Sequence, residues 1–350
     1  LVVEREMEIE AFRAREFWTV GAVLVTPRGQ EFDARLTGLG GKKLDKFDIP
    51  TAEAAELAVH AVTSRTLSVQ SVESRPATRN PSAPFMTSTL QQEASRKFGM
   101  GAKACMSAAQ RLYEAGHITY MRTDSPSLSQ QATSAARAAA AELFGKELVA
   151  DSPRVYGSKS KNAQEAHEAV RPSGEVFKHP SELASVLHGR SLALYELIWR
   201  RTVASQMADA KLSTTSVKFG VKLGGEELEL SASGTTVTYK GFLAVYDETR
   251  EDEGEEQAKL PQLEVGNTID VSEANAKSHQ TQPPARYTEA SLVKALEEQG
   301  IGVEVLPEGL RRRDSDTHRF WFNYNPFAVE WDGATIPSRD VRTRPPSRST

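Results

Sequence analysis

The sequence has little cysteine, no long apolar run and no excess of positive charge. Cys105 is the single cysteine among 350 residues. This excludes an intramolecular disulfide and a zinc site built from cysteines, and it fits a reducing compartment, the cytoplasm. No apolar run reaches the roughly 18–20 residues that cross a bilayer, so no membrane partner is expected. The formal net charge is −4, so any site for a polyanion must be a local patch.

Two further signals are missing. Neither of the glycine-rich phosphate loops, GxxxxGK followed by Ser or Thr and GxGxxG, is present, which argues against a nucleotide-driven motor. The first residues, from Leu1 to Glu8, include no initiator Met and no signal-peptide core, and their pattern is typical of a helix interior. We therefore expect a fragment that is cut on its N-terminal side.

The periodicity predicts a mixed α+β fold. Helices are expected at 1–15, 51–60, 88–97, 102–115, 127–145, 162–170, 191–207 and 288–300. Strands are expected at 17–25, 32–36, 67–73, 211–246 and 263–271. A helical domain is thus inserted between two β segments that could pair, and two crossings between the same two domains would form a hinge.

The strongest chemical signal lies between Ala108 and Ser129. A helix pattern ends at Gly116, and a short run through Tyr120 follows it. If this run is extended, Tyr120 and Arg122 point to the same face. A tyrosine can attack a phosphodiester while an arginine fork clamps its oxygens. Spacing alone, however, favours an ordinary half-buried tyrosine in an edge strand.

A second candidate lies on the predicted helix over 162–170. Gln164, His167 and Arg171 have the spacing i, i+3 and i+7, which places them on one helix face. His167 could donate to a phosphate oxygen or relay a proton, although a plain surface helix fits equally well. A zinc-protease helix is excluded, because the position four residues after His167 is Arg171, which cannot bind a metal.

Paired carboxylates occur at Asp314 and Asp316. Such pairs can hold Mg²⁺, but here they follow three arginines and no apolar strand leads into them. We therefore assign no metal ligand in this chain.

The segment from Leu112 to Ser125, LYEAGHITYMRTDS, is similar to the active-site segment of bacterial type IA DNA topoisomerases, and Met121 favours the topoisomerase I branch. Four other segments resemble the family in the family's order. They are LVVERE at 1–6, APFMTSTLQQ at 83–92, QEAHEAVRP at 164–172 and PPARYTEASLV at 283–293. The resemblance covers residues 1–302.

The resemblance implies that Tyr120 attacks a backbone phosphate of single-stranded DNA, forming a 5′-phosphotyrosine link and freeing a 3′-hydroxyl. It also implies that Arg122 holds the scissile phosphate and that His167 contacts DNA near it. We include Arg171, from the same segment, among the DNA contacts. Negative supercoils would relax without ATP, and a monomer is expected. The family uses Mg²⁺, whose ligands lie in a Toprim domain that is absent from this chain.

The implied architecture is a helical, tyrosine-bearing domain inserted into a β-rich hinged arch, as part of a toroidal core. The expected boundaries are the end of a DNA-gate helical domain at 1–15, the first part of the arch at 16–82, the tyrosine domain at 83–207, the second part of the arch at 208–282, a return to the gate domain at 283–302 and an atypical tail at 303–350.

Two departures from the family pattern limit these expectations. Without the Toprim domain, the chain alone is expected to be inactive in relaxation. After Gly302 the family's continuation is missing, so a poorly packed tail is expected. The alternative function is a non-catalytic module that binds single-stranded DNA through basic and aromatic residues of the helical block.

Overall fold

The computed structural model describes residues 1–63, 66–157, 168–223, 226–247 and 260–299, together with short strands between 310 and 344. The chain forms two compact units, residues 1–290 and residues 291–350. No helix in the described part of the chain is long and apolar enough to span a membrane.

The first unit combines runs of helices with long strands, and the second contains most of the last helix and several short strands. The α-helices are α1 (Val2–Ala11), α2 (Ala52–Thr63), α3 (Thr87–Phe98), α4 (Ala102–Glu114), α5 (Gln130–Phe144), α6 (Pro180–Leu183), α7 (Gly189–Ala204), α8 (Ala244–Asp247) and α9 (Glu289–Glu298). The strands are β1 (Glu16–Val25), β2 (Glu31–Leu39), β3 (Lys42–Lys43), β4 (Leu67–Arg79), β5 (Ala210–Leu223), β6 (Glu226–Tyr239), β7 (Thr268–Gln280), β8 (Leu310–Asp314), β9 (Arg319–Asn323), β10 (Val329–Trp331), β11 (Ala334–Ile336) and β12 (Val341–Arg344).

The large sheet of the first unit closes on itself. Its strand order is β1-β7-β4-β5-β6-β2-β3, and β1 also pairs with β2. These pairings are antiparallel, and the β4–β7 contact consists of just two residue pairs, Leu67 with Ile269 and Ser68 with Thr268. Alternate residues of β1, including Val20 and Leu24, are buried on one face, as expected for a sheet with one apolar side. The mixture of helices and a large antiparallel sheet confirms the predicted mixed α+β class.

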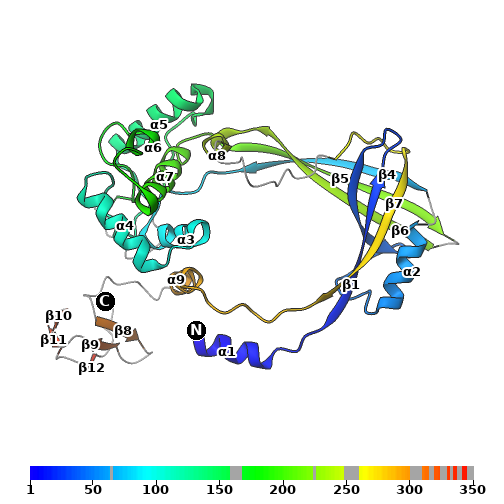
Figure 1. The fold of residues 1–350 in the computed structure, drawn as a ribbon, viewed down its shortest axis with the longest axis horizontal. Helices are drawn as coiled ribbons and strands as arrows, with labels where there is room; N and C mark the ends of the chain where they lie inside the picture. The colour runs from blue at the N-terminus through cyan, green and yellow to red at the C-terminus, as the bar shows by residue number, and fades with distance from the viewer. Residues whose placement is uncertain are drawn as a thin grey trace, which may run out of the picture. The chain divides into compact units, whose positions relative to one another are not determined.

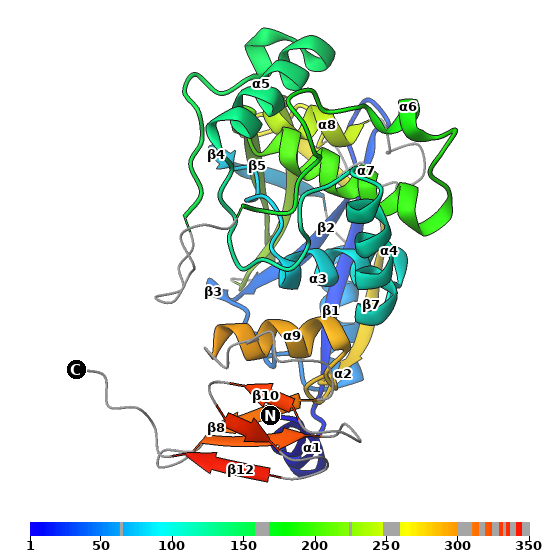
Figure 2. The same ribbon diagram turned by 90° about the vertical axis from the view of Figure 1, so that its left-hand side faces the viewer.

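Two separate hydrophobic cores hold the first unit together. One core lies among the helices and centres on α7, which buries Tyr195, Ile198 and Trp199. The other lies under the closed sheet and includes residues of α2. Strand β5 joins them, because Ala210 belongs to the helical core and Phe219 to the sheet core. Helices α3, α4 and α7 lie together in two perpendicular views, while β4 and β5 run on to the sheet (Figure 1, Figure 2).

Several predicted elements differ in length from the observed ones. Strand β4 continues to Arg79, six residues beyond the predicted end, although its second half is exposed. Backbone pairing with β5 explains this, since Arg79 pairs with Ala210 without needing an apolar face. Strand β7 likewise extends through polar residues to Gln280, where it pairs with β1.

The helix predicted over 162–170 is wrong at its C-terminal end. Residues 162–167 lie outside the described residues, but 168–170 are not helical. Val170 forms a bridge with Phe85, and Pro172 forms one with Ile118. Pro172 explains the extended backbone before it, because a proline disfavours the α conformation of the preceding residue, Arg171.

The second unit contains strands that the sequence pattern did not predict. Strands β8, β9 and β12 form a three-stranded sheet, and β10 pairs with β11. The poor packing expected for the tail at 303–350, and the domain boundaries expected elsewhere, stay predictions.

Candidate active site

A sharp turn at the end of α4 leads into the tyrosine segment. Gly116 has φ +72°, a left-handed conformation that glycine adopts without strain. The His117 N–H then donates back to the Leu112 carbonyl at 2.8 Å, which closes the end of the helix. The turn therefore sends the chain away from α4 toward Tyr120.

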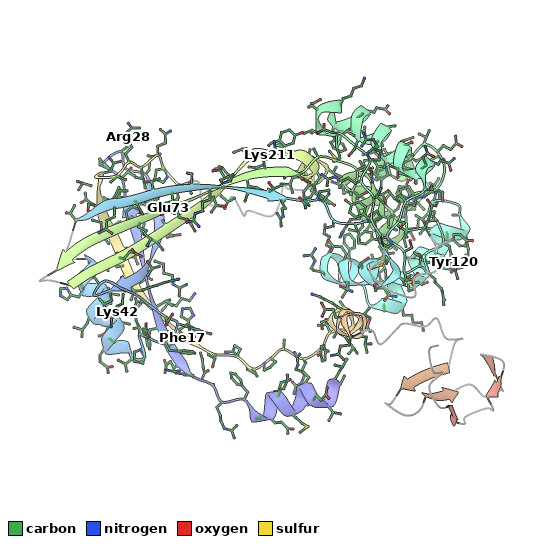
Figure 3. The ribbon with its side chains drawn as sticks, turned by 180° about the vertical axis from the view of Figure 1, so that it is seen from behind. Phe17, Arg28, Lys42, Glu73, Tyr120 and Lys211 are labelled. Carbon is green, nitrogen blue, oxygen red and sulfur yellow. The ribbon has the colours of Figure 1, made fainter. Side chains whose placement is uncertain are left out.

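Burial alternates along the segment that follows. Ile118, Met121 and Thr123 are buried, whereas Tyr120 and Arg122 are exposed, with half of the Tyr120 surface open to solvent. The segment is not a regular strand, since it forms one isolated bridge, between Ile118 and Pro172. The alternation still presents the tyrosine and the arginine to solvent, as the extended spacing predicts. Figure 3 shows Tyr120 on the helical part of the molecule, whereas Phe17 and Glu73 lie on the sheet.

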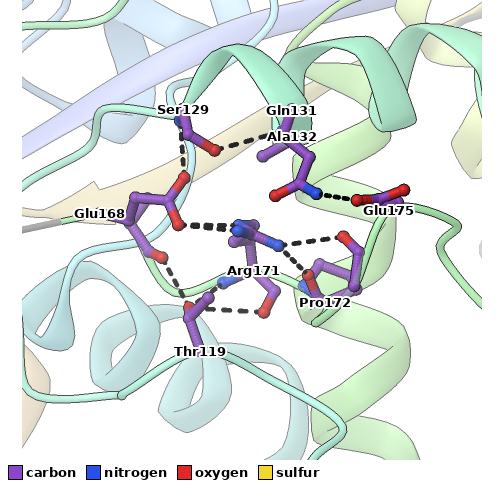
Figure 4. Close-up of polar contacts among 10 residues, drawn as sticks. Thr119, Ser129, Gln131, Ala132, Glu168, Arg171, Pro172 and Glu175 are labelled. Carbon is purple, nitrogen blue, oxygen red and sulfur yellow. Dashed lines mark hydrogen bonds and ion pairs between the residues drawn. The ribbon is translucent and has the colours of Figure 1, made fainter.

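The residue before Tyr120 is held by a neighbouring segment. The Thr119 N–H donates to the Arg171 carbonyl at 2.9 Å, and its hydroxyl donates to the Ala169 carbonyl at 2.8 Å. The same hydroxyl accepts from the Arg171 N–H at 3.0 Å (Figure 4). Three hydrogen bonds thus fix the backbone on the N-terminal side of the tyrosine.

The residues after Tyr120 are held by the start of α3. The Thr87 hydroxyl donates to the Met121 carbonyl at 2.7 Å and accepts from the Thr123 N–H at 2.8 Å. The Thr87 N–H donates to the Thr123 carbonyl at 2.9 Å. The backbone on both sides of Tyr120 is therefore anchored while its side chain remains exposed.

A second tyrosine lies beside the first. The rings of Tyr113, on α4, and Tyr120 meet edge to face, with centroids 5.3 Å apart and an interplanar angle of 66°. Such pairs favour one relative orientation of the two rings. Tyr113 is exposed to a similar degree as Tyr120, which makes it a natural control for chemistry at the hydroxyl.

An ion pair lies directly behind the tyrosine segment. The Arg171 guanidinium donates to the Glu168 carboxylate through Nη2 at 2.7 Å and Nε at 3.2 Å. Burial acts to raise the pKa of Glu168, but hydrogen bonds from Arg171 and Ser129 outweigh it and hold the pKa below its usual value. The carboxylate is therefore charged at neutral pH.

Of the remaining residues considered in the sequence, the structure describes Asp314 but not Gln164, His167 or Asp316. Gln164 and His167 lie outside the described residues, so the contact of His167 with DNA stays a prediction. Asp314 ends β8, and Asp316 also lies outside the described residues. Within the described part, no group of three or more His, Cys, Asp or Glu side chains could hold a metal ion.

Sequence reasoning missed two residues that shape the site, Thr87 and Glu168. Thr87 lies 33 positions before Tyr120 in the sequence, and neither charge nor periodicity marks it. Glu168 lies within the family-like segment at 164–172, but no role was predicted for it. Their roles depend on contacts between distant segments, which local patterns do not encode.

Comparison with known proteins places this site in a family. Residues 1–304 match the family model described as DNA topoisomerase. The chain is 47% identical over 330 residues to DNA topoisomerase 1 of Mycolicibacterium smegmatis and 48% identical over 328 residues to that of Streptomyces coelicolor. Each match covers 86% of this chain but only 35% and 34% of the relative, so the chain spans about a third of their length.

A solved structure agrees with the sequence matches. The full-length topoisomerase I of Thermotoga maritima superposes with a TM-score of 0.69 at 28% identity, covering 96% of this chain and 51% of that one. The chain belongs to the DNA topoisomerase family. Within it, the named relatives and the structural neighbour identify a bacterial type IA topoisomerase, which confirms the resemblance seen in the sequence.

Proposed function

We propose that this chain carries the DNA-cleaving tyrosine of a type IA topoisomerase, an isomerase that changes DNA topology, and that Tyr120 is the nucleophile. The observation that carries the proposal is the exposed Tyr120 side chain on a backbone anchored on both sides by Thr119 and Thr87. A nucleophile held in one geometry does not have to be ordered again in the transition state.

The proposed reaction is a transesterification. The Tyr120 oxygen bonds to a backbone phosphorus of single-stranded DNA, the bond from phosphorus to the 3′ oxygen breaks, and the tyrosine proton ends on that oxygen. The product is a 5′-phosphotyrosine link and a free 3′-hydroxyl. Attack by the 3′-hydroxyl reverses the step and reseals the strand, so neither oxidant nor ATP is consumed.

Arg122 is proposed to hold the scissile phosphate. It is exposed two residues after Tyr120, and its planar guanidinium can donate to two phosphate oxygens at once. Charge neutralisation and positioning supply most of the catalysis in phosphoryl transfer. His167 is proposed as a further DNA contact on the strength of the family motif.

The family's requirement for Mg²⁺ is not met by the described residues of this chain, which hold no cluster of ligands for it. We propose that the chain alone does not complete relaxation of negative supercoils. It would work in the cytoplasm as part of a monomeric, toroidal enzyme, in which a β-rich arch carries the tyrosine domain and a helical domain forms the DNA gate.

The test is covalent capture of DNA. The chain is incubated with a single-stranded oligonucleotide and Mg²⁺, with and without a separate polypeptide that carries the part of the relatives it does not span. A 3′ label should remain on the protein and a 5′ label should leave on a shortened strand. Tyr120→Phe should abolish the adduct, and Tyr113→Phe should retain it.

The alternative is a non-catalytic module that binds single-stranded DNA. It predicts salt-sensitive binding that is indifferent to Tyr120→Phe, and no adduct under any complementation. If Tyr113→Phe instead loses the adduct and Tyr120→Phe keeps it, the nucleophile is Tyr113 and not Tyr120.

A further inference from the structure

Arg171 was predicted to contact DNA, but its guanidinium is directed into the protein. The residue is only 7% exposed. Its Nε and Nη2 donate to Glu168, and its Nη1 donates to the Pro172 carbonyl at 2.9 Å and the Gly174 carbonyl at 3.4 Å (Figure 4). A DNA phosphate that accepted from both Nε and Nη2 would have to displace the Glu168 carboxylate.

The carboxylate of Glu168 has a second partner on a different element. Its Oε1 accepts from the Ser129 N–H at 2.6 Å, and Ser129 is the N-cap of α5. Backbone N–H groups and the helix dipole at this end favour a negative charge. Glu168 therefore ties the start of α5 to Arg171, and both of its oxygens are used within the protein.

The backbone of Arg171 continues this connection to the nucleophile segment. Its N–H and its carbonyl both bond to Thr119, at 3.0 and 2.9 Å. Thr119 immediately precedes Tyr120. The Glu168–Arg171 ion pair thus holds the backbone of Arg171 in place. That backbone in turn holds Thr119, the residue before Tyr120.

We propose that Glu168 and Arg171 are positioning residues, which hold Tyr120 in the geometry for attack and do not contact DNA. The inference rests on the proposed function of Tyr120, because positioning matters only for a reacting side chain. It also revises the expectation that Arg171 belongs to the DNA-binding surface.

Two alternatives make different predictions. A phosphate-binding arginine contributes to affinity, and its loss weakens binding and lowers the salt slope by about 1. A positioning pair leaves binding unchanged and slows only the chemical step, where displacement by about 1 Å costs up to about 100-fold. Glu168 distinguishes the two alternatives further. A carboxylate repels DNA phosphates, so removal of its charge does not weaken a direct DNA contact, and a slower reaction in this variant points to positioning.

The experiment compares Glu168→Gln, Arg171→Gln and the control Glu175→Gln in the full chain. Glu175 accepts a hydrogen bond from Gln131 of α5 close by, but on the exposed surface. Glu168→Gln keeps the size and shape of the side chain, so we expect the fold to be preserved. Three quantities are measured: the single-turnover rate of adduct formation in the complemented reaction, the Kd and salt slope for single-stranded DNA, and hydrogen exchange of the Thr119 amide.

We expect Glu168→Gln and Arg171→Gln to slow adduct formation about 10- to 100-fold. Their Kd should stay within about twofold of the parent with an unchanged salt slope, and the Thr119 amide should exchange faster. Glu175→Gln should change none of these quantities. Weaker binding with a reduced slope in Arg171→Gln alone, or an unchanged adduct rate in both variants, would overturn the inference.

The readouts also separate failure of this inference from failure of the proposed function. Amide exchange and DNA binding do not require cleavage, so they test the anchoring of Thr119 even if Tyr120→Phe leaves the adduct intact. Unchanged Thr119 exchange in both variants counts against the positioning role, whereas an adduct that survives Tyr120→Phe counts against the nucleophile.

Discussion

Thr87 and Thr123 are joined by hydrogen bonds that run in both directions. The Thr87 N–H donates to the Thr123 carbonyl, and the Thr123 N–H donates to the Thr87 hydroxyl. This pair connects the first residue of α3 to the segment after Tyr120, across 36 positions of sequence. The tyrosine thus depends on a residue from a separate helix.

Thr87→Val should destabilise the helical core by about 1–3 kcal/mol, because it leaves the Thr123 N–H and the Met121 carbonyl without their partner. Thr87→Ser keeps the hydroxyl and should stay within about 1 kcal/mol of the parent. Denaturant unfolding measures both. Equal stability of the two variants would show that the hydroxyl does not anchor the segment.

The stability conferred by Glu168 should depend on pH. Its pKa in the folded state lies below the ordinary value of 4.5, so its contribution is fully present above that value and is lost as the pH falls through the folded pKa. The thermal midpoint of Glu168→Gln should therefore lie below that of the parent at neutral pH and approach it in acid. A gap that is constant with pH would contradict the ion pair.

Cys105 should be inert in the folded chain. It is fully buried in α4, and burial raises the pKa of its thiol to about 11, so little reactive thiolate forms at pH 8. We expect alkylation by iodoacetamide at least about 100-fold slower than at an exposed cysteine. Ser107→Cys, on the exposed side of the same helix, provides the comparison, and fast labelling of Cys105 without denaturant would refute the burial.

Gly241→Ala should disturb the junction between β6 and α8. Gly241 has φ +49°, and an added Cβ would collide with the backbone carbonyls of Ala208 and Asp209. We expect a loss of more than about 2 kcal/mol in unfolding free energy. Gly266 also has a positive φ, +89°, but open space surrounds it, so Gly266→Ala should lose only about 1 kcal/mol. Equal losses would mean that strain, and not collision, decides the cost.

The sequence predicted much of the first unit because its elements carry clear local signals. The Ala-rich helix α5 ends before Gly145 as expected, and its N-cap is Ser129, two residues after the predicted start at 127. Tyr120 and Arg122 are both exposed, as an extended spacing implies. These features depend on neighbours along the chain, which a pattern records.

The errors arose where distant segments meet. Residues after 167 had a helical spacing, but Val170 pairs with Phe85 and the chain is extended there. The guanidinium of Arg171 donates to Glu168 and to two backbone carbonyls, and the sequence pattern did not indicate these contacts. Backbone pairing between segments that are distant in sequence outweighs the local helical preference here, and a local sequence pattern does not contain that information.

The outer half of β4 has a consequence for solubility. In the described part of the chain, residues 71–79 pair with β5 on one side only, so the other side is an open strand edge that another chain could join. Pro76 lacks the N–H that such a partner would need, and Arg75 and Arg79 place charges beside it. This exposed edge of β4 is thus protected against aggregation by its own residues.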